Sequence, residues 1–335
     1  MNFAIVGCGF IGEKRASLLA PAGKLIIAAD VNVERARSLA ARYDAQATED
    51  YRTAATHPAV DVVIVATSHD QLIDVAVAAA QANKHVLLEK PGARTPGELA
   101  RLQQAATVSG AQVHVGFNHR FHPAMIKARE IIDSGALGPL YFIRGRYGHG
   151  GRPGYEKEWR ASPQISGGGE LLDQGAHLID LSQWFFGKPF TRISGELATY
   201  FWDMPVEDNA FMTLATDTNQ IAHLHVSWTE WKNMFSLEIT GRDAKLHIDG
   251  LGGSYGTERL AFYQMKPEMG PPDTTIYEYP GPDLSWQVEI LQFIHDIQLQ
   301  RKVEPSLTST GHVLSVVEKL YQAHHAPWLE ASRTQ

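Results

Sequence analysis

The stretch Phe3-Ala4-Ile5-Val6-Gly7-Cys8-Gly9-Phe10-Ile11-Gly12, near the start of the chain, decides the fold. Its four apolar residues predict a buried parallel strand, and the six residues that follow match the pattern G-x-G-x-x-G. The first glycine permits a tight turn, the second lets the backbone approach a pyrophosphate, and the third lets a helix pack closely on the strand. The pattern predicts a dinucleotide site with the phosphates at the helix N-terminus, lined by Gly7, Gly9, Phe10, Ile11 and Gly12.

An acidic residue lies where such a site needs one. Asp30 ends the second apolar run, Leu25 to Ala29, about 20 residues after the glycine turn. A carboxylate there accepts hydrogen bonds from ribose hydroxyls and repels a 2′-phosphate, so NAD is favoured over NADP. Arg35 and Arg37 keep NADP as the less favoured alternative, although arginines on a helix usually face solvent.

The order of the predicted elements divides the chain in two. Strand-like and helical segments alternate up to about residue 117, which predicts an α/β Rossmann domain, a doubly wound parallel sheet with helices on both faces. After residue 140, alternating segments predict an α+β domain around an antiparallel sheet, and the Gly- and Pro-rich residues 250–283 are expected to form long loops. We therefore expect two domains, residues 1–118 and 119–335.

The bulk composition excludes several classes of protein. The chain has 335 residues, 44% of them hydrophobic and 20% charged, and a formal charge of −7, which is typical of a soluble globular protein without a nucleic-acid or anionic-membrane partner. No apolar run is long enough to span a bilayer, and no secretory signal is expected. The single cysteine, Cys8, is expected to be a small packing residue and is compatible with a cytoplasmic protein.

Two segments contain residues that can bind a substrate or transfer a proton. Glu89-Lys90-Pro91 follows the predicted strand His85 to Leu88. Ligands of an open parallel sheet bind beyond the carboxyl ends of its strands, so Lys90 is placed to reach a substrate. A lysine at an X-Pro corner is equally consistent with a surface residue.

The second segment runs from Gly167 to Asp180 and begins with three glycines. Asp173 and His177 are four residues apart and share one helical face, so they can present a carboxylate and an imidazole to one point. Histidine is a natural proton acceptor for an alcohol near neutral pH. A metal pair or a buried His–Asp hydrogen bond are the alternatives, but no further residue has metal-ligand spacing, so no metal is expected.

Together, the glycine turn, Glu89-Lys90-Pro91 and the pattern Gly-Gly-Gly-x-Leu-x-Asp-x-Gly-x-His resemble the Gfo/Idh/MocA family of glucose–fructose oxidoreductases and inositol dehydrogenases. The resemblance implies a carbohydrate or cyclitol substrate and the catalytic residues Lys90, Asp173 and His177. It also implies that Glu89 and Lys90 contact the cofactor, that Pro91 is cis, and that the second domain has a large, mostly antiparallel open sheet. The second domain would bind the substrate, and its sheet would form the interface of a homodimer or homotetramer.

One segment departs from the family pattern. Ser68 stands where the family has proline, and Leu72 stands where it has histidine, with His69 shifted along the chain. Thr67, at the end of a predicted strand, remains an expected cofactor contact.

The substrate-binding residues are expected in two further segments. The resemblance implies that Asn118 and Arg120 face the substrate, although anchoring the connection between the domains is an equal alternative for Arg120. Arg152, Trp159 and Arg160 belong to a cationic stretch, residues 144–160, that suits a phosphate, a uronate or the diphosphate of a nucleotide sugar. The alternatives are that its arginines point outward or are neutralised by Glu156 and Glu158, and that Trp159 and Trp228 are core residues rather than stacking surfaces.

These residues predict the oxidation of a secondary hydroxyl of a sugar, cyclitol or nucleotide sugar, or the reverse reduction. His177 would take the hydroxyl proton, and Lys90 would stabilise the developing negative charge. Asp173 would orient the substrate or tune the lysine–histidine pair. Two other functions stay open. One is an NAD-dependent glycosidase or lyase without net redox change, and the other is a non-catalytic NAD-binding regulator.

Overall fold

The computed structural model describes residues 1–326 and divides into two compact units. The first consists of Met1–Phe117, Gln164–Gly167 and Trp286–Leu314, and the second contains most of the remaining residues. The first break, between Phe117 and Asn118, lies beside the boundary expected from sequence. Residues 286–314 group with the first unit, whereas the expected domains placed them in the second.

The first unit is built on a six-stranded parallel sheet with the strand order β3-β2-β1-β4-β5-β6. All four residues of β4 are buried, as expected for a strand covered on both faces. The order reverses at β1, and in such sheets ligands bind beside this point, beyond the carboxyl ends of the strands. The strands are β1 (Asn2–Val6), β2 (Lys24–Ala29), β3 (Gln46–Thr48), β4 (Val62–Val65), β5 (His85–Glu89) and β6 (Val113–Gly116).

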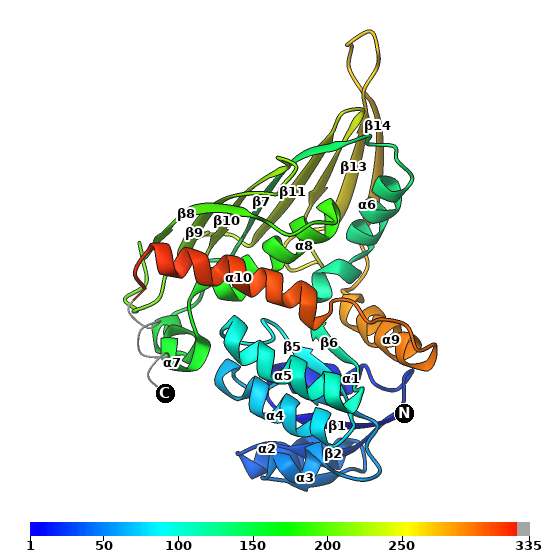
Figure 1. The fold of residues 1–335 in the computed structure, drawn as a ribbon, viewed down its shortest axis with the longest axis vertical. Coiled ribbons are helices and arrows are strands. Elements are labelled where there is room, and N and C mark those ends of the chain that lie inside the picture. The colour runs from blue at the N-terminus through cyan, green and yellow to red at the C-terminus, as the bar shows by residue number, and fades with distance from the viewer. Residues whose placement is uncertain (327–335) are drawn as a thin grey trace. The chain divides into compact units, whose positions relative to one another are not determined.

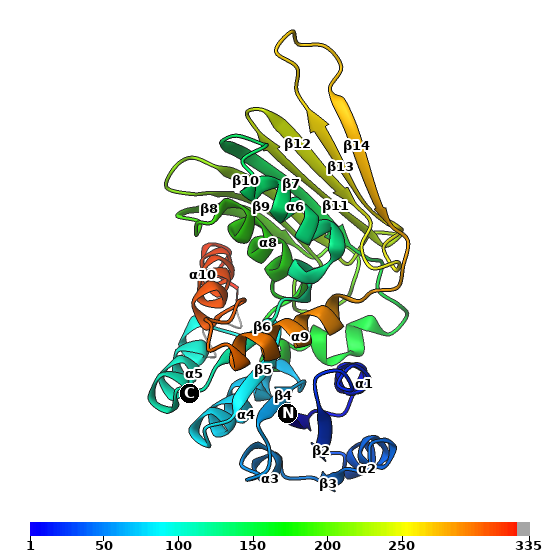
Figure 2. The same ribbon diagram turned by 90° about the vertical axis from the view of Figure 1, so that its right-hand side faces the viewer.

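Helices cover both faces of this sheet (Figures 1 and 2). Apolar residues of α1, α2 and α9 share one buried cluster with Phe3 and Ile5 of β1, whereas α4 packs between α3 and α5 on the other face. Ile290, Phe293 and Ile294 of α9 belong to that cluster, which explains why this late segment joins the first unit. The helices are α1 (Phe10–Ser17), α2 (Val33–Arg42), α3 (Tyr51–Ala55), α4 (His69–Gln81), α5 (Pro96–Ser109) and α9 (Ser285–Gln298).

The second unit contains an eight-stranded sheet with the order β14-β13-β12-β11-β7-β10-β9-β8. All neighbours are antiparallel except β7 and β10, so the expected mostly antiparallel sheet is confirmed. The strands are β7 (Leu140–Gly148), β8 (Arg192–Ala198), β9 (Asn209–Ala215), β10 (Ile221–Ser227), β11 (Met234–Gly241), β12 (Ala244–Asp249), β13 (Glu258–Gln264) and β14 (Asp273–Tyr279).

The helices α6 and α8 pack on one face of this sheet (Figure 1). The opposite face presents exposed side chains, among them Arg144, Phe211 and His223, as the alternation of β7, β9 and β10 requires. The helical segments are η1 (Asn118–Phe121), α6 (Pro123–Asp133), η2 (Tyr155–Lys157), η3 (Trp159–Ala161), η4 (Leu171–Gly175) and α8 (Ala176–Phe186), while α7 (Pro163–Ser166) and α10 (Leu307–Ala323) have residues in both units.

One prediction for this unit was wrong. Residues 250–283 were expected to be long loops, but they contain β13 and β14. Their glycines and prolines lie mainly in the connections, and β14 is an edge strand with mostly exposed residues, so it lacks the apolar alternation that marks a half-buried strand. Within residues 1–326, none of the helices combines the length and apolarity needed to cross a membrane.

Candidate active site

The glycine turn of the first unit has the shape of a phosphate cradle. Gly7 has φ +92°, and a Cβ there would lie 2.4 Å from the carbonyl oxygen of Ala66. A Cβ on Gly12 would lie 1.9 Å from the oxygen of Gly7, so this glycine is needed for close packing. Gly9, at the N-cap of α1, faces open space, which leaves room for a pyrophosphate at the helix N-terminus. The turn therefore fits the dinucleotide that the sequence predicts.

Asp30 is tied into the same turn. Its Oδ2 accepts a hydrogen bond from the Cys8 N–H at 2.7 Å, and its Oδ1 accepts one from the Asn32 N–H at 2.8 Å. Each carboxylate oxygen has a second lone pair that a ribose hydroxyl can use. Arg37 is exposed and pairs with Glu34 at 2.7 Å, so it behaves as a solvated helix residue.

Cys8 is a packing residue. Its side chain is buried, and Sγ lies 3.4 Å from the carbonyl oxygen of Ala29. Burial, and after it the negative charges of Asp30 and Glu13, raise the pKa of the thiol to about 12. The thiol stays protonated near neutral pH and is no nucleophile.

The remaining expected cofactor residues of this unit lie near the carboxyl ends of β1 and β4. Phe10 is 81% exposed at the start of α1, and Ile11 beside it is half-buried. Thr67 is half-buried, and its hydroxyl donates to the carbonyl of Ser68 at 3.1 Å. Nδ1 of His69 donates a hydrogen bond to the carbonyl of Ser166 at 2.8 Å. The cofactor contacts of Phe10, Ile11 and Thr67 stay predictions.

Lys90 follows β5 directly, and its peptide bond to Pro91 is cis, as the resemblance implied. The side chain of Lys90 is half-buried. Glu89 before it is buried, and its Oε1 pairs with Nε of Arg15 at 2.7 Å. Burial raises the pKa of Glu89, although the charge of Arg15 opposes this shift. The carboxylate thus anchors the end of β5 beside Lys90, and a cofactor contact of Glu89 stays a prediction.

This anchor extends into α9, which sequence patterns did not reveal. Arg15 also pairs with Glu289 at 2.6 Å, and Nε2 of His114 lies 3.2 Å from the same carboxyl group. The ring of Trp286 lies over the guanidinium of Arg15, at 4.3 Å from its centroid. No motif marks these pairs because their partners are far apart in the sequence.

In the second unit, Asp173 and His177 lie on one continuous helix formed by η4 and α8. Its first turn is held by Glu207, whose Oε1 accepts the N–H groups of Gly169 at 3.1 Å and Leu171 at 3.0 Å. Glu207 also accepts the hydroxyl of Tyr321 at 2.8 Å. The main-chain N–H of Asp173 bonds to the carbonyl of Gly169, so this brace fixes the start of the segment with both predicted catalytic residues.

His177 is 4% exposed and stacks on His119, with the ring centroids 3.7 Å apart and the planes at 25°. The His119 ring makes an edge contact with Tyr147, which in turn contacts Tyr255 at 5.1 Å. The stack fixes the orientation of the His177 imidazole beside His119. His119, Tyr147 and Tyr255 were not among the predicted site residues.

Asp173 is 8% exposed, and its Oδ2 lies 3.4 Å from Nε of Arg160. The guanidinium of Arg160 lies over the ring of Trp159 at 4.6 Å. Arg152 is 67% exposed and pairs with Glu158 at 2.6 Å. Of the three predicted substrate residues of this stretch, Arg160 therefore contacts Asp173, Trp159 lies beneath Arg160, and Arg152 is paired with Glu158.

Asn118 and Arg120 are turned inward within the second unit. Arg120 donates two hydrogen bonds to Asp180, at 2.7 and 2.6 Å, and both side chains are buried. Nδ2 of Asn118 donates to the hydroxyl of Ser285 at 2.9 Å. For Arg120, the buried pair with Asp180 suits the anchoring alternative, and a substrate contact of Asn118 or Arg120 stays a prediction.

The cationic stretch 144–160 is divided by the alternation of β7. Arg144 and Arg146 point to the face opposite Tyr147, and Arg144 pairs with Glu238. Trp228 is fully buried and belongs to the core, as the alternative to sugar stacking predicted. Among residues 1–326, no three His, Cys, Asp or Glu side chains are grouped to hold a metal ion.

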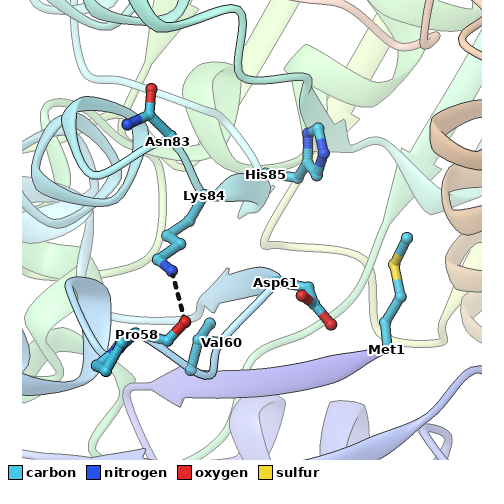
Figure 3. A pocket seen from close by; sticks show the side chains of 7 residues that line it. All are labelled: Met1, Pro58, Val60, Asp61, Asn83, Lys84 and His85. Carbon is cyan, nitrogen blue, oxygen red and sulfur yellow. Dashed lines mark hydrogen bonds between the residues drawn. The ribbon is translucent and has the colours of Figure 1, made fainter.

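A hollow of about 370 Å³ lies at the other edge of the parallel sheet, at the amino ends of β1, β4 and β5 (Figure 3). The ammonium of Lys84 points to the carbonyl of Pro58 at 3.4 Å, and Asp61 accepts the N–H of Asn2. The cofactor turn follows the carboxyl end of β1, so this hollow is no part of the candidate site. Its lining residues are Met1, Pro58, Val60, Asp61, Asn83, Lys84 and His85.

The fold and the glycine turn define a protein with an NAD-binding Rossmann domain. The model for the oxidoreductase family with an NAD-binding Rossmann fold matches residues 1–117, and the model for the GFO/IDH/MocA C-terminal domain matches residues 125–247. The chain belongs to the Gfo/Idh/MocA family, as the sequence motifs implied, and NAD is its cofactor.

Named relatives are similar over part of their length. Levoglucosan dehydrogenase of Pseudarthrobacter phenanthrenivorans is 32% identical to this chain, in a match that covers 64% of this chain and 58% of the relative. Inositol 2-dehydrogenase of Salmonella paratyphi B is 30% identical, in a match that covers 58% of this chain and 56% of the relative. The matches thus span less than two thirds of these relatives. A solved levoglucosan dehydrogenase in complex with NADH and levoglucosan superposes with a TM-score of 0.84 at 24% identity, covering 96% of each chain, which shows the shared fold.

Proposed function

We propose that the protein is an NAD-dependent dehydrogenase that oxidises a secondary hydroxyl of a sugar, cyclitol or nucleotide sugar, or catalyses the reverse reduction. The observation that supports this most strongly is the helix of the second unit whose start is held by Glu207. Asp173 and His177 lie one turn apart on this helix. The names of the relatives, levoglucosan and inositol dehydrogenases, support the same substrate class.

His177 is the proposed base, because its nearly buried imidazole is held in place by the stack on His119. An imidazole nitrogen takes the proton of the substrate hydroxyl. Lys90 donates a hydrogen bond to the same oxygen and stabilises its negative charge. Asp173, paired with Arg160, accepts a neighbouring hydroxyl and orients the ring. NAD bound at the glycine turn supplies the acceptor for the hydride that leaves the carbon.

Two further proposals concern the oligomeric state and the location of the protein. We propose that the face with Phe211 and Ile221 joins copies of this chain as a homodimer or homotetramer, because both side chains are exposed there. We also propose a cytoplasmic location, with which the single, buried Cys8 is compatible.

Variants of the three catalytic residues test the function. Lys90→Met, Asp173→Asn and His177→Gln should each lower kcat by about a hundredfold or more, because each removes a group that acts in the reaction step. NADH binding should be retained in Asp173→Asn and His177→Gln, whereas Lys90 is also an expected cofactor contact. Lys84→Met, at the opposite edge of the sheet, is the matched control and should leave kcat unchanged. Full activity of Lys90→Met would contradict the proposal.

A further inference from the structure

An aromatic surface at one end of the second sheet has no role in the chemistry described so far. Phe201 is 58% exposed and Trp231 is 88% exposed, and their rings meet edge to face with centroids 5.5 Å apart. Phe201 lies in the connection between β8 and β9, and Trp231 in that between β10 and β11. Large exposed rings of this kind, brought together from two loops, commonly mark a binding surface.

The surface is rigidly built. The buried carboxylate of Asp208 accepts three successive main-chain N–H groups, those of Tyr200 and Phe201 at 2.9 Å and that of Trp202 at 3.1 Å. The indole N–H of Trp202 donates to the carbonyl of Trp228 at 2.9 Å. Because the main chain at Phe201 is fixed in this way, a ligand does not have to order this loop, which lowers the entropy cost of binding.

A run of rings connects this surface with Asp173. Trp231 contacts Phe201, Phe201 contacts Trp202 at 5.1 Å, and Trp202 contacts Tyr155 at 5.6 Å. From Tyr155 the contacts continue to the proposed catalytic carboxylate. Arg152 lies over the Tyr155 ring and pairs with Glu158, which lies 3.8 Å from Arg160, and Arg160 lies 3.4 Å from Asp173.

Polar groups border Tyr155, the last ring of this run. Arg152 lies over the ring of Tyr155 at 5.8 Å and pairs with Glu158. Aromatic faces with donors and acceptors at their edge suit a pyranose ring, whose C–H groups form an apolar face and whose hydroxyls form a polar rim. A purely apolar partner would leave these charged groups without water.

We propose that Phe201 and Trp231 form a stacking subsite for the second sugar ring of a glycoside or disaccharide whose oxidised ring lies beside Asp173. The inference rests on the proposed function and specifies its substrate class: glycosides extended by a further ring are preferred over free monosaccharides and cyclitols.

Kinetics with paired substrates test the subsite. The probes are methyl glycosides and the corresponding disaccharides of glucose, galactose and xylose, in both anomeric forms, with NAD. Phe201→Ala and Trp231→Ala should lower kcat/KM for the preferred disaccharide by about tenfold and leave the methyl glycoside within about twofold, since one stacking contact is lost. Tyr141→Ala, which removes a half-exposed aromatic ring from β7, is the control and should change neither.

A binding measurement gives a second readout that does not need turnover. The disaccharide should quench the fluorescence of Trp231, and Trp231→Ala should lack this signal. Three outcomes would each overturn the subsite. The first is an equal loss of kcat/KM for disaccharides and methyl glycosides, and the second is that no disaccharide is preferred. The third is a change of the oligomeric state of Trp231→Ala in sedimentation velocity. Oxidation of monosaccharides without that preference would leave the dehydrogenase function intact, whereas no NAD reduction by any polyol would refute the function itself.

Discussion

The hydroxyl of Tyr321 donates a hydrogen bond to Oε1 of Glu207 at 2.8 Å, and both side chains are buried. The main-chain N–H of Gly169 also reaches the Tyr321 oxygen, at 3.2 Å. Gly168 is needed for this approach, because a Cβ there would lie 2.0 Å from that oxygen. A residue of α10 and a residue before β9 thus brace the turn from which Asp173 and His177 follow.

Tyr321→Phe should therefore lower the free energy of unfolding by about 1 kcal/mol, since a buried hydrogen bond is lost while the ring still fills its place. Urea unfolding measures the change. Tyr141→Phe alters a half-exposed tyrosine and should leave the unfolding free energy unchanged. Equal stability of Tyr321→Phe and the unaltered protein would show that the brace does not depend on this hydroxyl.

Glu207 should make stability depend on pH. Burial raises its pKa from 4.5 to about 7, so the folded state holds a proton that the unfolded state has lost between these values. Stability therefore falls as the pH rises from about 4.5 to about 7, by roughly 3 kcal/mol for this group, and is flat above.

Glu207→Gln isolates that contribution. The amide oxygen can still accept the three donors that now reach Oε1, while no charge has to be buried. Unfolding free energies measured at several pH values should show a smaller decline for the variant over this range. The same slope in both proteins would assign the pH dependence to other groups.

Gly9→Ala should separate cofactor binding from folding. A Cβ at this position meets open space in the protein, so the melting temperature should be retained. The added methyl would occupy the place expected for the pyrophosphate, and NADH affinity in calorimetry should fall by about tenfold or more. Gly12→Ala is the contrasting variant, because its Cβ would meet the Gly7 oxygen at 1.9 Å and should destabilise the fold itself. Unchanged NADH affinity in Gly9→Ala would place the phosphates elsewhere.

Arg120→Met distinguishes anchoring from substrate binding. Removal of one partner from the buried pair with Asp180 should cost about 3–5 kcal/mol, and adding Asp180→Leu should restore much of this loss. The folded fraction should keep its KM for the sugar. A raised KM without loss of stability would instead assign Arg120 to the substrate.

The sequence was sufficient for features that depend on neighbouring residues. The glycine turn, Asp30 at the end of β2, and the spacing of Asp173 and His177 on one helix are all local patterns, and the structure has each of them in place. The parallel sheet followed from the alternation of strands and helices. The identification of the family rested on the order of three such motifs.

What sequence could not provide depends on contacts between distant residues. Arg15 meets Glu289, and Glu207 meets Tyr321, only after the chain has folded, and no spacing rule links either pair. The side chains of Asn118 and Arg120 turned inward because partners became available at Ser285 and Asp180. The strand β14 was missed because its residues are mostly exposed and lack an apolar alternation.

The central claim is hydride transfer from a sugar or cyclitol carbon to NAD. The most direct test is to mix the protein with NAD, or with NADP for comparison, and each member of a panel of sugars, cyclitols, glycosides and nucleotide sugars, and to record NADH absorbance while the product is analysed. We predict one NADH for each substrate molecule oxidised to a ketone, with NAD preferred. Cleavage products formed without accumulation of NADH, or no product from any polyol, would contradict the account.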